Sequence, residues 1–160
     1  IAWSEEVTET KKKSFLKTYG SNSLDSLVER LQSTSDPKRR YEYILWLAKK
    51  LPLLTEDLHL ETTKVKGCIS EVYVLGIISN GKIQWKGYSD ALITKGLLAF
   101  LIKGLNDLTP LEVLSIDEKF IEMTGLSKSL TPSRANGFLN IFLKMKAQAK
   151  DFSLVSSNNE

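Results

Sequence analysis

The chain has 160 residues, 42% of them hydrophobic, so it can form one domain whose core needs neither metal nor disulfide support. No apolar run reaches the roughly 18 residues of a membrane-spanning helix, so we expect a soluble protein without membrane contact. The net charge of +3 is too balanced to favour nucleic-acid binding, and the basic runs 11–13 and 38–40 are short and accompanied by no aromatic stacking motif.

The two ends of the chain differ in composition from its middle. Residues 1–22 and 151–160 are polar and lack a sustained apolar period. We therefore predict a flexible N-terminal segment over 1–22, one domain over 23–150 and a flexible polar tail over 151–160. The first residues lack the charged-then-apolar order of a signal peptide, but a removed targeting segment would leave no trace, so the compartment stays open.

Two helices are predicted in the first third of the domain. Ser23 is a candidate cap for the first, and Asp36-Pro37 is a cap-and-proline start for the second. Leu51-Pro52 should end the second helix, because proline disfavours a helical residue before it. The predicted inward faces comprise, in chain order, Leu24, Leu27, Val28 and Leu31, and then Tyr41, Ile44, Leu45 and Ala48.

A β-hairpin follows these helices. Residues 71–75 read as a strand, Asn80-Gly81 supplies a turn that favours positive φ, and 83–85 run back. The segment 89–102 begins with Ser89 as a cap and is apolar on nearly every face, which predicts a central buried helix.

Three further helices complete the prediction. They cover 111–114 after Pro110, 117–123, and a last helix that starts at Thr131-Pro132. The buried face of the last helix is predicted to hold Phe138, Ile141, Phe142 and Met145. Strands grouped between helices indicate an α+β fold, with a small antiparallel β-sheet packed against several helices.

The chemistry of the chain centres on its only cysteine, Cys68. The single histidine, His59, precedes it by nine positions in a polar stretch, so a Cys–His hydrolase has little support and His59 is expected to be an ordinary surface residue. No phosphate-binding glycine loop or metal-ligand set is present. Cys68 is then either a small buried core residue or a thiol that works with a partner, with Gly67 giving freedom and Lys64 and Lys66 favouring a thiolate.

Five short motifs resemble the SufE family of sulfur-acceptor proteins, over roughly residues 24–150. The motif around the thiol, residues 65–74, is Val-Lys-Gly-Cys-Ile-Ser-Glu-Val-Tyr-Val. The others are Gly-Tyr-Ser-Asp-Ala-Leu-Ile-Thr-Lys-Gly-Leu at 87–97, Ser-Leu-Thr-Pro-Ser-Arg-Ala-Asn-Gly at 129–137, Asp-Pro-Lys-Arg-Arg-Tyr at 36–41 and Leu-Pro at 51–52. The last third is similar to cyanobacterial and plastid members.

The resemblance implies a function as well as a fold. Cys68 would accept persulfide sulfur from a SufS-like cysteine desulfurase, stimulate that enzyme, and relay the sulfur to an iron–sulfur scaffold. The pyridoxal phosphate would belong to the desulfurase, so this chain would act as a carrier and activator without a cofactor or metal of its own. The implied fold is similar to that of the IscU-type scaffold, and the implied location is the plastid stroma or the bacterial cytoplasm.

The same motifs nominate residues around Cys68. Arg134 would stabilise the thiolate or the persulfide, the alternative being a structural salt bridge. Asp90 would cap the central helix or take part in partner docking. Lys95 and Asn136 are secondary candidates.

Two hypotheses concern motion and an alternative role. The loop at Gly67 is expected to bury the thiol at rest and swing it out on docking. The alternative function is a non-catalytic module that binds or regulates a desulfurase, as part of a longer fused protein.

Overall fold

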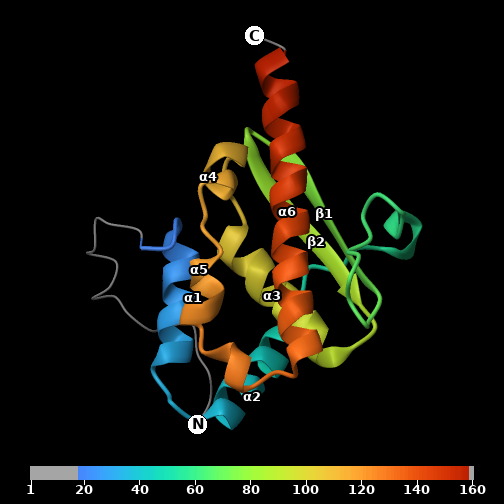
Figure 1. Ribbon diagram of the computed structural model, residues 1–160. Helices are drawn as coiled ribbons and strands as arrows, with labels where there is room; N and C mark the ends of the chain where they lie inside the picture. Colours follow the sequence, from blue (N-terminus) through green and yellow to red (C-terminus); the bar gives the residue numbers. More distant parts are fainter. Residues whose placement is uncertain (1–17, 159–160) are drawn as a thin grey trace.

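The computed structural model describes residues 18–158, and the side chains among them as far as Val155 (Figure 1). Helix α3 lies at the centre, in contact with α1, α2, α6 and β2, and the hairpin runs along one side of the molecule beside α6. The elements are α1 (Asn22–Gln32), α2 (Pro37–Ala48), the 3-10 helix η2 (Glu56–Leu58), β1 (Val72–Ser79), β2 (Lys82–Ser89), α3 (Leu92–Leu105), α4 (Pro110–Leu114), α5 (Lys119–Met123), the 3-10 helix η3 (Leu126–Lys128) and α6 (Pro132–Asn158). The predicted α+β class is confirmed.

Helix α1 begins two residues earlier than predicted. Its cap is Ser21 rather than Ser23, with the Ser21 hydroxyl accepting a bond from the Leu24 amide at 2.9 Å and donating to the Gly104 carbonyl at 2.7 Å. The second bond explains the choice, because only Ser21 also reaches α3. The predicted buried stripe of α1 is confirmed.

The predicted flexible N-terminal segment lies mostly outside the described residues, which begin at Thr18. Its last part is tied to α1, since the amides of Thr18 and Tyr19 donate to the Asp25 carboxylate at 2.8 and 2.7 Å. Flexibility of the segment 1–22 stays a prediction.

Helix α2 starts as predicted, with Asp36 as cap and Pro37 in the first turn. Its buried face was predicted partly out of phase: Tyr41 is 36% exposed and Leu45 half-buried. The residues that pack inward are Tyr43, Ile44, Leu47 and Ala48.

The hairpin is confirmed and is longer than predicted. Asn80 and Gly81 both have positive φ, of 54° and 77°, and Ser79 pairs with Lys82. Gly76 lies beyond the predicted end of the first strand, but its amide donates to the Gln148 side chain of α6 at 2.8 Å, and the strand continues to Ser79.

Both outer edges of the hairpin are covered along much of their length. On β1, Val74 bonds with Thr63, and the amide of Gln148 spans the Val74 carbonyl and the Gly76 amide. On β2, the backbone of Gly87 bonds with those of Pro52 and Leu54. Further along the same edge, residues 106–108 bond with the backbone of Ile83 and Trp85.

Helix α3 is the predicted central helix, buried on nearly every face. Ser89 does not cap it: the cap position is Ala91, and Ser89 ends β2. Hairpin and helix are therefore joined by only a few residues, which brings the start of α3 next to the end of β2.

Helix α6 runs along the hairpin and projects beyond its turn (Figure 1). Its start at Pro132 and the predicted buried face are confirmed. The helix continues through the polar residues 151–158, which were predicted to form a flexible tail; that flexibility stays a prediction, and 159–160 lie outside the described part. Among residues 18–158, no helix combines the length and apolarity that crossing a bilayer requires.

The contact between α2 and α3 makes the first test. A β-carbon at Gly96 would lie 2.2 Å from the Ile44 carbonyl oxygen, whereas one at Gly104 would meet a movable methyl of Leu24 at 2.9 Å. We expect Gly96→Ala to lower the free energy of unfolding by about 3 kcal/mol in urea titrations, although alanine is intrinsically the better helix former by about 1 kcal/mol. Gly104→Ala is the matched control and should lose much less. A Gly96→Ala protein as stable as the parent would contradict this packing.

Candidate functional site

Cys68 lies in a short loop over 66–71 whose two ends are tied together. The Val65 amide donates to the Val72 carbonyl at 2.8 Å, and the Val74 amide donates to Thr63 at 2.9 Å. Residues 63–65 thus pair with the start of β1, a pairing that the sequence reading missed. The loop 66–71, hereafter the Cys loop, is held at its neck while its tip is free of ladder bonds.

Gly67 is required by the shape of this loop. Its φ is +81°, a left-handed conformation that favours glycine, and an added β-carbon would lie 2.6 Å from the Asn140 side-chain nitrogen. The same Asn140 nitrogen donates to the Gly67 carbonyl at 3.1 Å. Helix α6 therefore holds the Cys loop by its backbone, next to the thiol.

The thiol itself lies against α6. Cys68 is half-buried and its Sγ is 3.8 Å from the Gly137 carbonyl oxygen, to which the thiol donates. A β-carbon at Gly137 would stand 3.4 Å from Sγ, which is an ordinary van der Waals contact, so the sulfur lies directly against this part of the helix. The next residue, Ile69, is 70% exposed. The loop tip therefore pairs a sheltered thiol with an exposed apolar side chain.

Two opposing effects act on the acidity of Cys68. Burial raises the pKa of the thiol, and the nearby Arg134 charge lowers it by a smaller amount, so the net shift is upward. At rest the thiol is thus predominantly protonated near neutral pH. Of the basic residues predicted to favour a thiolate, Lys66 instead lies 3.6 Å from the Glu61 carboxylate.

Arg134 occupies the third position of α6, as predicted. Its guanidinium donates to the hydroxyl of Thr94 on α3 at 2.5 Å and to the hydroxyl of Ser70 in the Cys loop. Among the described residues its partners are these hydroxyls rather than a carboxylate, so the salt-bridge alternative is wrong. One guanidinium joins α6, α3 and the Cys loop.

Asp90 has a different structural role from helix capping. Its carboxylate accepts a bond from the Glu71 amide at 3.0 Å, and its own amide donates to the Glu71 carbonyl at 3.3 Å. Helix α3 has no side-chain cap, so that prediction is wrong. Asp90 ties the end of the Cys loop to the end of β2.

The other polar candidates do not reach the thiol. His59 is half-buried rather than an ordinary surface residue: it stacks between Tyr73 and Tyr88 at 4.6 and 4.4 Å, and its Nε2 donates to the Leu54 carbonyl at 2.9 Å. Lys95 and Asn136 make no side-chain hydrogen bond or ion pair with the Cys loop in the described part of the chain. No group of three metal-ligating side chains occurs there either.

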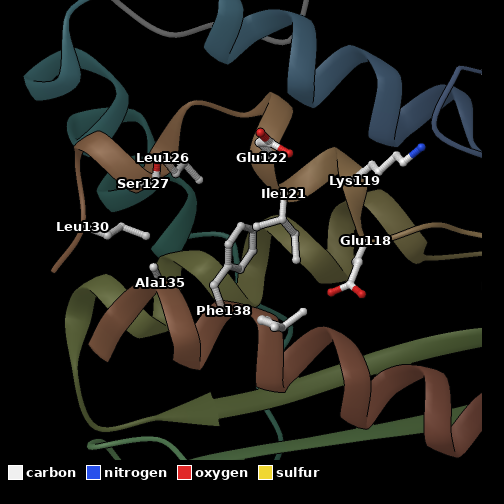
Figure 2. Close-up of a pocket in the computed structure, with 10 residues that line it drawn as sticks. Glu118, Lys119, Ile121, Glu122, Leu126, Ser127, Leu130, Ala135 and Phe138 are labelled. Carbon is white, nitrogen blue, oxygen red and sulfur yellow. The ribbon is translucent and has the colours of Figure 1, made fainter. Parts of the chain in front are cut away.

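Of two cavities on the described surface, one borders the thiol. An open, polar cavity of about 520 Å³ borders Cys68 and is lined by Glu61, Lys64, Lys66, Glu71 and Asp90 among others. Figure 2 shows the second, of about 420 Å³, where side chains of α5, η3 and α6 converge with Leu130 from the link between η3 and α6. Its lining contains neither a cysteine nor a histidine, so we place the candidate site at the first cavity.

Four residues of the site were not nominated from the sequence: Ser70, Thr94, Gly137 and Asn140. Two of them carried a usable signal. Arg134, Gly137 and Asn140 recur at three-residue spacing in a predicted helix, which places them on one face. Thr94 carried no such signal, because a threonine within an apolar helix cannot be told from an ordinary core residue.

The bond between Asn140 and Gly67 provides a test of how the thiol is sheltered. One neutral hydrogen bond contributes about 1 kcal/mol, so Asn140→Ala should make Cys68 about fivefold more reactive if alkylation requires the loop to open. The measurement is the rate of modification by N-ethylmaleimide at fixed pH. Asn136→Ala, an exposed asparagine on the same helix, is the control and should leave the rate unchanged. Equal rates in all three proteins would show that this bond does not hold the loop.

Comparison with known proteins identifies the family. A family model described as "SufE: Fe-S metabolism associated domain" matches residues 25–149. The chain is 49% identical over 138 residues to an uncharacterized SufE-like protein of Synechocystis, covering 86% of this chain and 87% of that protein. It is 42% identical over 117 residues to the cysteine desulfuration protein SufE of Plasmodium vivax, covering 71% of this chain and 46% of the relative.

Two further matches extend the comparison. The chloroplastic/mitochondrial SufE-like protein 1 of Arabidopsis thaliana is 36% identical over 127 residues, which cover 79% of this chain and 34% of the plant protein. The chain thus spans about a third of the plant relative and under half of the Plasmodium vivax one. A solution structure of a hypothetical protein from Thermus thermophilus superimposes with a TM-score of 0.70 at 25% identity, covering 81% of this chain and 94% of that one. The chain belongs to the SufE family.

Proposed function

We propose that this protein accepts sulfur from the persulfide of a cysteine desulfurase onto Cys68 and delivers it to iron–sulfur cluster assembly. The observation that carries the proposal is a lone thiol in a glycine-containing loop, sheltered against α6 beside a fixed positive charge, while the histidine His59 is bonded elsewhere. The family description and the names of the Plasmodium relatives, cysteine desulfuration proteins, support it.

The proposed transfer fits a thiol without a histidine. The Cys68 thiolate attacks the terminal sulfur of the donor persulfide, a new sulfur–sulfur bond forms, and the donor's own sulfur–sulfur bond breaks. The donor cysteine leaves as a thiolate, the proton lost by Cys68 goes to solvent, and no net oxidation occurs. The pyridoxal phosphate of the reaction belongs to the desulfurase, and this chain supplies no cofactor.

The resting site requires a movement before this attack. A half-buried thiol with a raised pKa is a poor nucleophile, so the Cys loop has to carry Cys68 outward. The ties that break in that movement include Asn140 to Gly67, Arg134 to Ser70 and Cys68 to Gly137. The paired neck at Val65 and Val72 can stay intact, which limits the displacement to the tip.

The remaining parts of the proposal concern context. Relatives from a cyanobacterium and from the plant organelles favour the bacterial cytoplasm or the plastid stroma. The alternative is a regulatory module that binds a desulfurase without carrying sulfur. Its basis is that the matched segment forms only part of the longer plant and Plasmodium relatives.

Partner docking can be tested at the loop tip. Ile69→Asp should slow loading of Cys68 by a desulfurase at least about tenfold, because an exposed apolar side chain next to the thiol becomes charged; the loss corresponds to about 1.4 kcal/mol. Sulfur gain is followed by intact mass at limiting desulfurase. The control is Leu111→Asp, which alters an equally exposed leucine on α4 (71% exposed), near the turn of the hairpin and far from the Cys loop (Figure 1). Equal slowing by both variants would remove Ile69 from the docking surface.

The transfer itself is tested with Cys68→Ser. The protein is incubated with a matching desulfurase and free cysteine, and its intact mass is measured with and without reductant. We expect a reductant-sensitive gain of one sulfur atom on the parent and none on the variant. Desulfurase stimulation should also be lost in the variant; stimulation that survives without Cys68 would favour the regulatory alternative instead.

A further inference from the structure

Thr94 connects three elements at the candidate site. It lies near the start of α3 and its side chain is only 3% exposed. Its hydroxyl accepts from the Arg134 guanidinium of α6 at 2.5 Å and lies 3.3 Å from the hydroxyl of Ser70 in the Cys loop. The Arg134 guanidinium therefore donates both to a buried threonine of the central helix and to the loop that carries the thiol.

We propose that Thr94 is a positioning residue that holds the Arg134 guanidinium at the resting place of Cys68, so that a persulfide anion is retained there more firmly than the unloaded thiol. The inference rests on the proposed function and adds a preferred direction of loop movement to it. In this arrangement Thr94 is the fixed partner of Arg134 and Ser70 is the movable one.

The packing of α3 explains why Thr94 stays in place. Gly96, two residues further on, lies directly against the backbone of α2, where any added carbon would meet the Ile44 carbonyl at 2.2 Å. Ser70, by contrast, belongs to a loop tip whose neighbour Ile69 is exposed. When the tip moves outward, the bond from Arg134 to Ser70 breaks and the bond to Thr94 remains. The positive charge therefore stays behind at the vacated site.

Arg134 supplies the positive charge that the other charged groups around the Cys loop lack in sum. The open cavity beside Cys68 is lined by two lysines and three carboxylates, which are Lys64, Lys66, Glu61, Glu71 and Asp90. These five groups come from the Cys loop, the segment before it and the end of β2, and their sum is one negative charge. A thiolate or persulfide at Cys68 would add a further negative charge here. The cation that stabilises this charge is Arg134, which approaches from α6.

The loading state then determines how strongly the loop closes. The unloaded thiol is protonated at rest because burial raises its pKa, so Arg134 gains little from its return. A persulfide is a stronger acid than the parent thiol and is anionic near neutral pH. Its terminal sulfur therefore interacts with the guanidinium as an ion, and retraction of the loaded loop is favoured over that of the empty loop.

The experiment measures the pH dependence of Cys68 alkylation by iodoacetamide in the full chain, with no desulfurase present. Thr94→Val should raise the apparent pKa of Cys68 by about half a unit, which is about a threefold loss of rate below that pKa. Thr94→Ser keeps the hydroxyl and should restore the parent profile. The control is Thr124→Val, which changes another fully buried threonine, bonded to the Ile121 carbonyl at 2.6 Å and remote from the thiol.

A double variant separates positioning from general destabilisation. If Thr94 acts through Arg134, then Thr94→Val should add nothing to the shift caused by Arg134→Gln. A second measurement loads Cys68 with inorganic polysulfide and follows release of the sulfur to cyanide, which should be about threefold faster in Thr94→Val than in the parent or in Thr94→Ser.

Three results would overturn the inference. They are a parent-like pH profile in folded Thr94→Val, an equal shift in Thr124→Val, or additive shifts in the double variant. Neither assay uses a desulfurase, so a failure here is distinct from a failure of Cys68 to accept sulfur from that enzyme.

Discussion

The site depends on one close approach, that of the Cys68 sulfur to the backbone of α6 at Gly137. The thiol lies against the helix backbone there, with Sγ 3.8 Å from the Gly137 carbonyl oxygen, and is half-buried. The same face of α6 then brings Asn140 to the loop backbone and Arg134 to the loop's Ser70. Shelter, retention and positive charge all reach the loop from one helix.

The helix in turn is placed by the core beneath it. Phe138, Ile141, Phe142 and Met145 anchor its buried face, and Gln148 fixes its position along β1. The ties to the Cys loop are single hydrogen bonds, each of about 1 kcal/mol, whereas the anchors are fully buried side chains of about 1.5–3 kcal/mol each. The loop can therefore open while the surface that receives it stays intact.

Much of the fold could be predicted because local chemistry decides it. Asn80-Gly81 fixes the hairpin turn, and Pro132 with the apolar stripe after it fixes the start and phase of α6. Helix α2 was placed correctly but its face was not, since Tyr43 and Leu47 fit an inward stripe as well as Tyr41 and Leu45 do. The length of α6 could not be predicted from its apolar stripe, because polar residues such as those at 151–158 can continue a helix that a buried core has already begun.

The site was predictable only in part, for a related reason. Family motifs pointed to Cys68, Gly67 and Arg134, and the structure brings these together. The role of Asp90 and the paired neck of the loop depend on residues far apart in sequence, which no local pattern indicates. The cap of α1 is Ser21 instead of the predicted Ser23 for the same reason, because the Ser21 hydroxyl also donates to Gly104 in the distant helix α3.

The covered edges of the hairpin limit how another protein can bind. Proteins often recruit an extended peptide by letting it join a sheet as an extra strand. Here Thr63, Val65 and Gln148 bond to the outer edge of β1, and chain segments around Pro52 and Leu108 bond to the outer edge of β2. Most of the outward backbone groups of residues 72–76 and 83–87 are therefore already paired. Recognition through strand addition is thereby closed off along this stretch. A partner that binds beside the hairpin therefore contacts side chains and the Cys loop instead of a free strand edge. A change in the position of the loop then also changes the surface that the partner recognises.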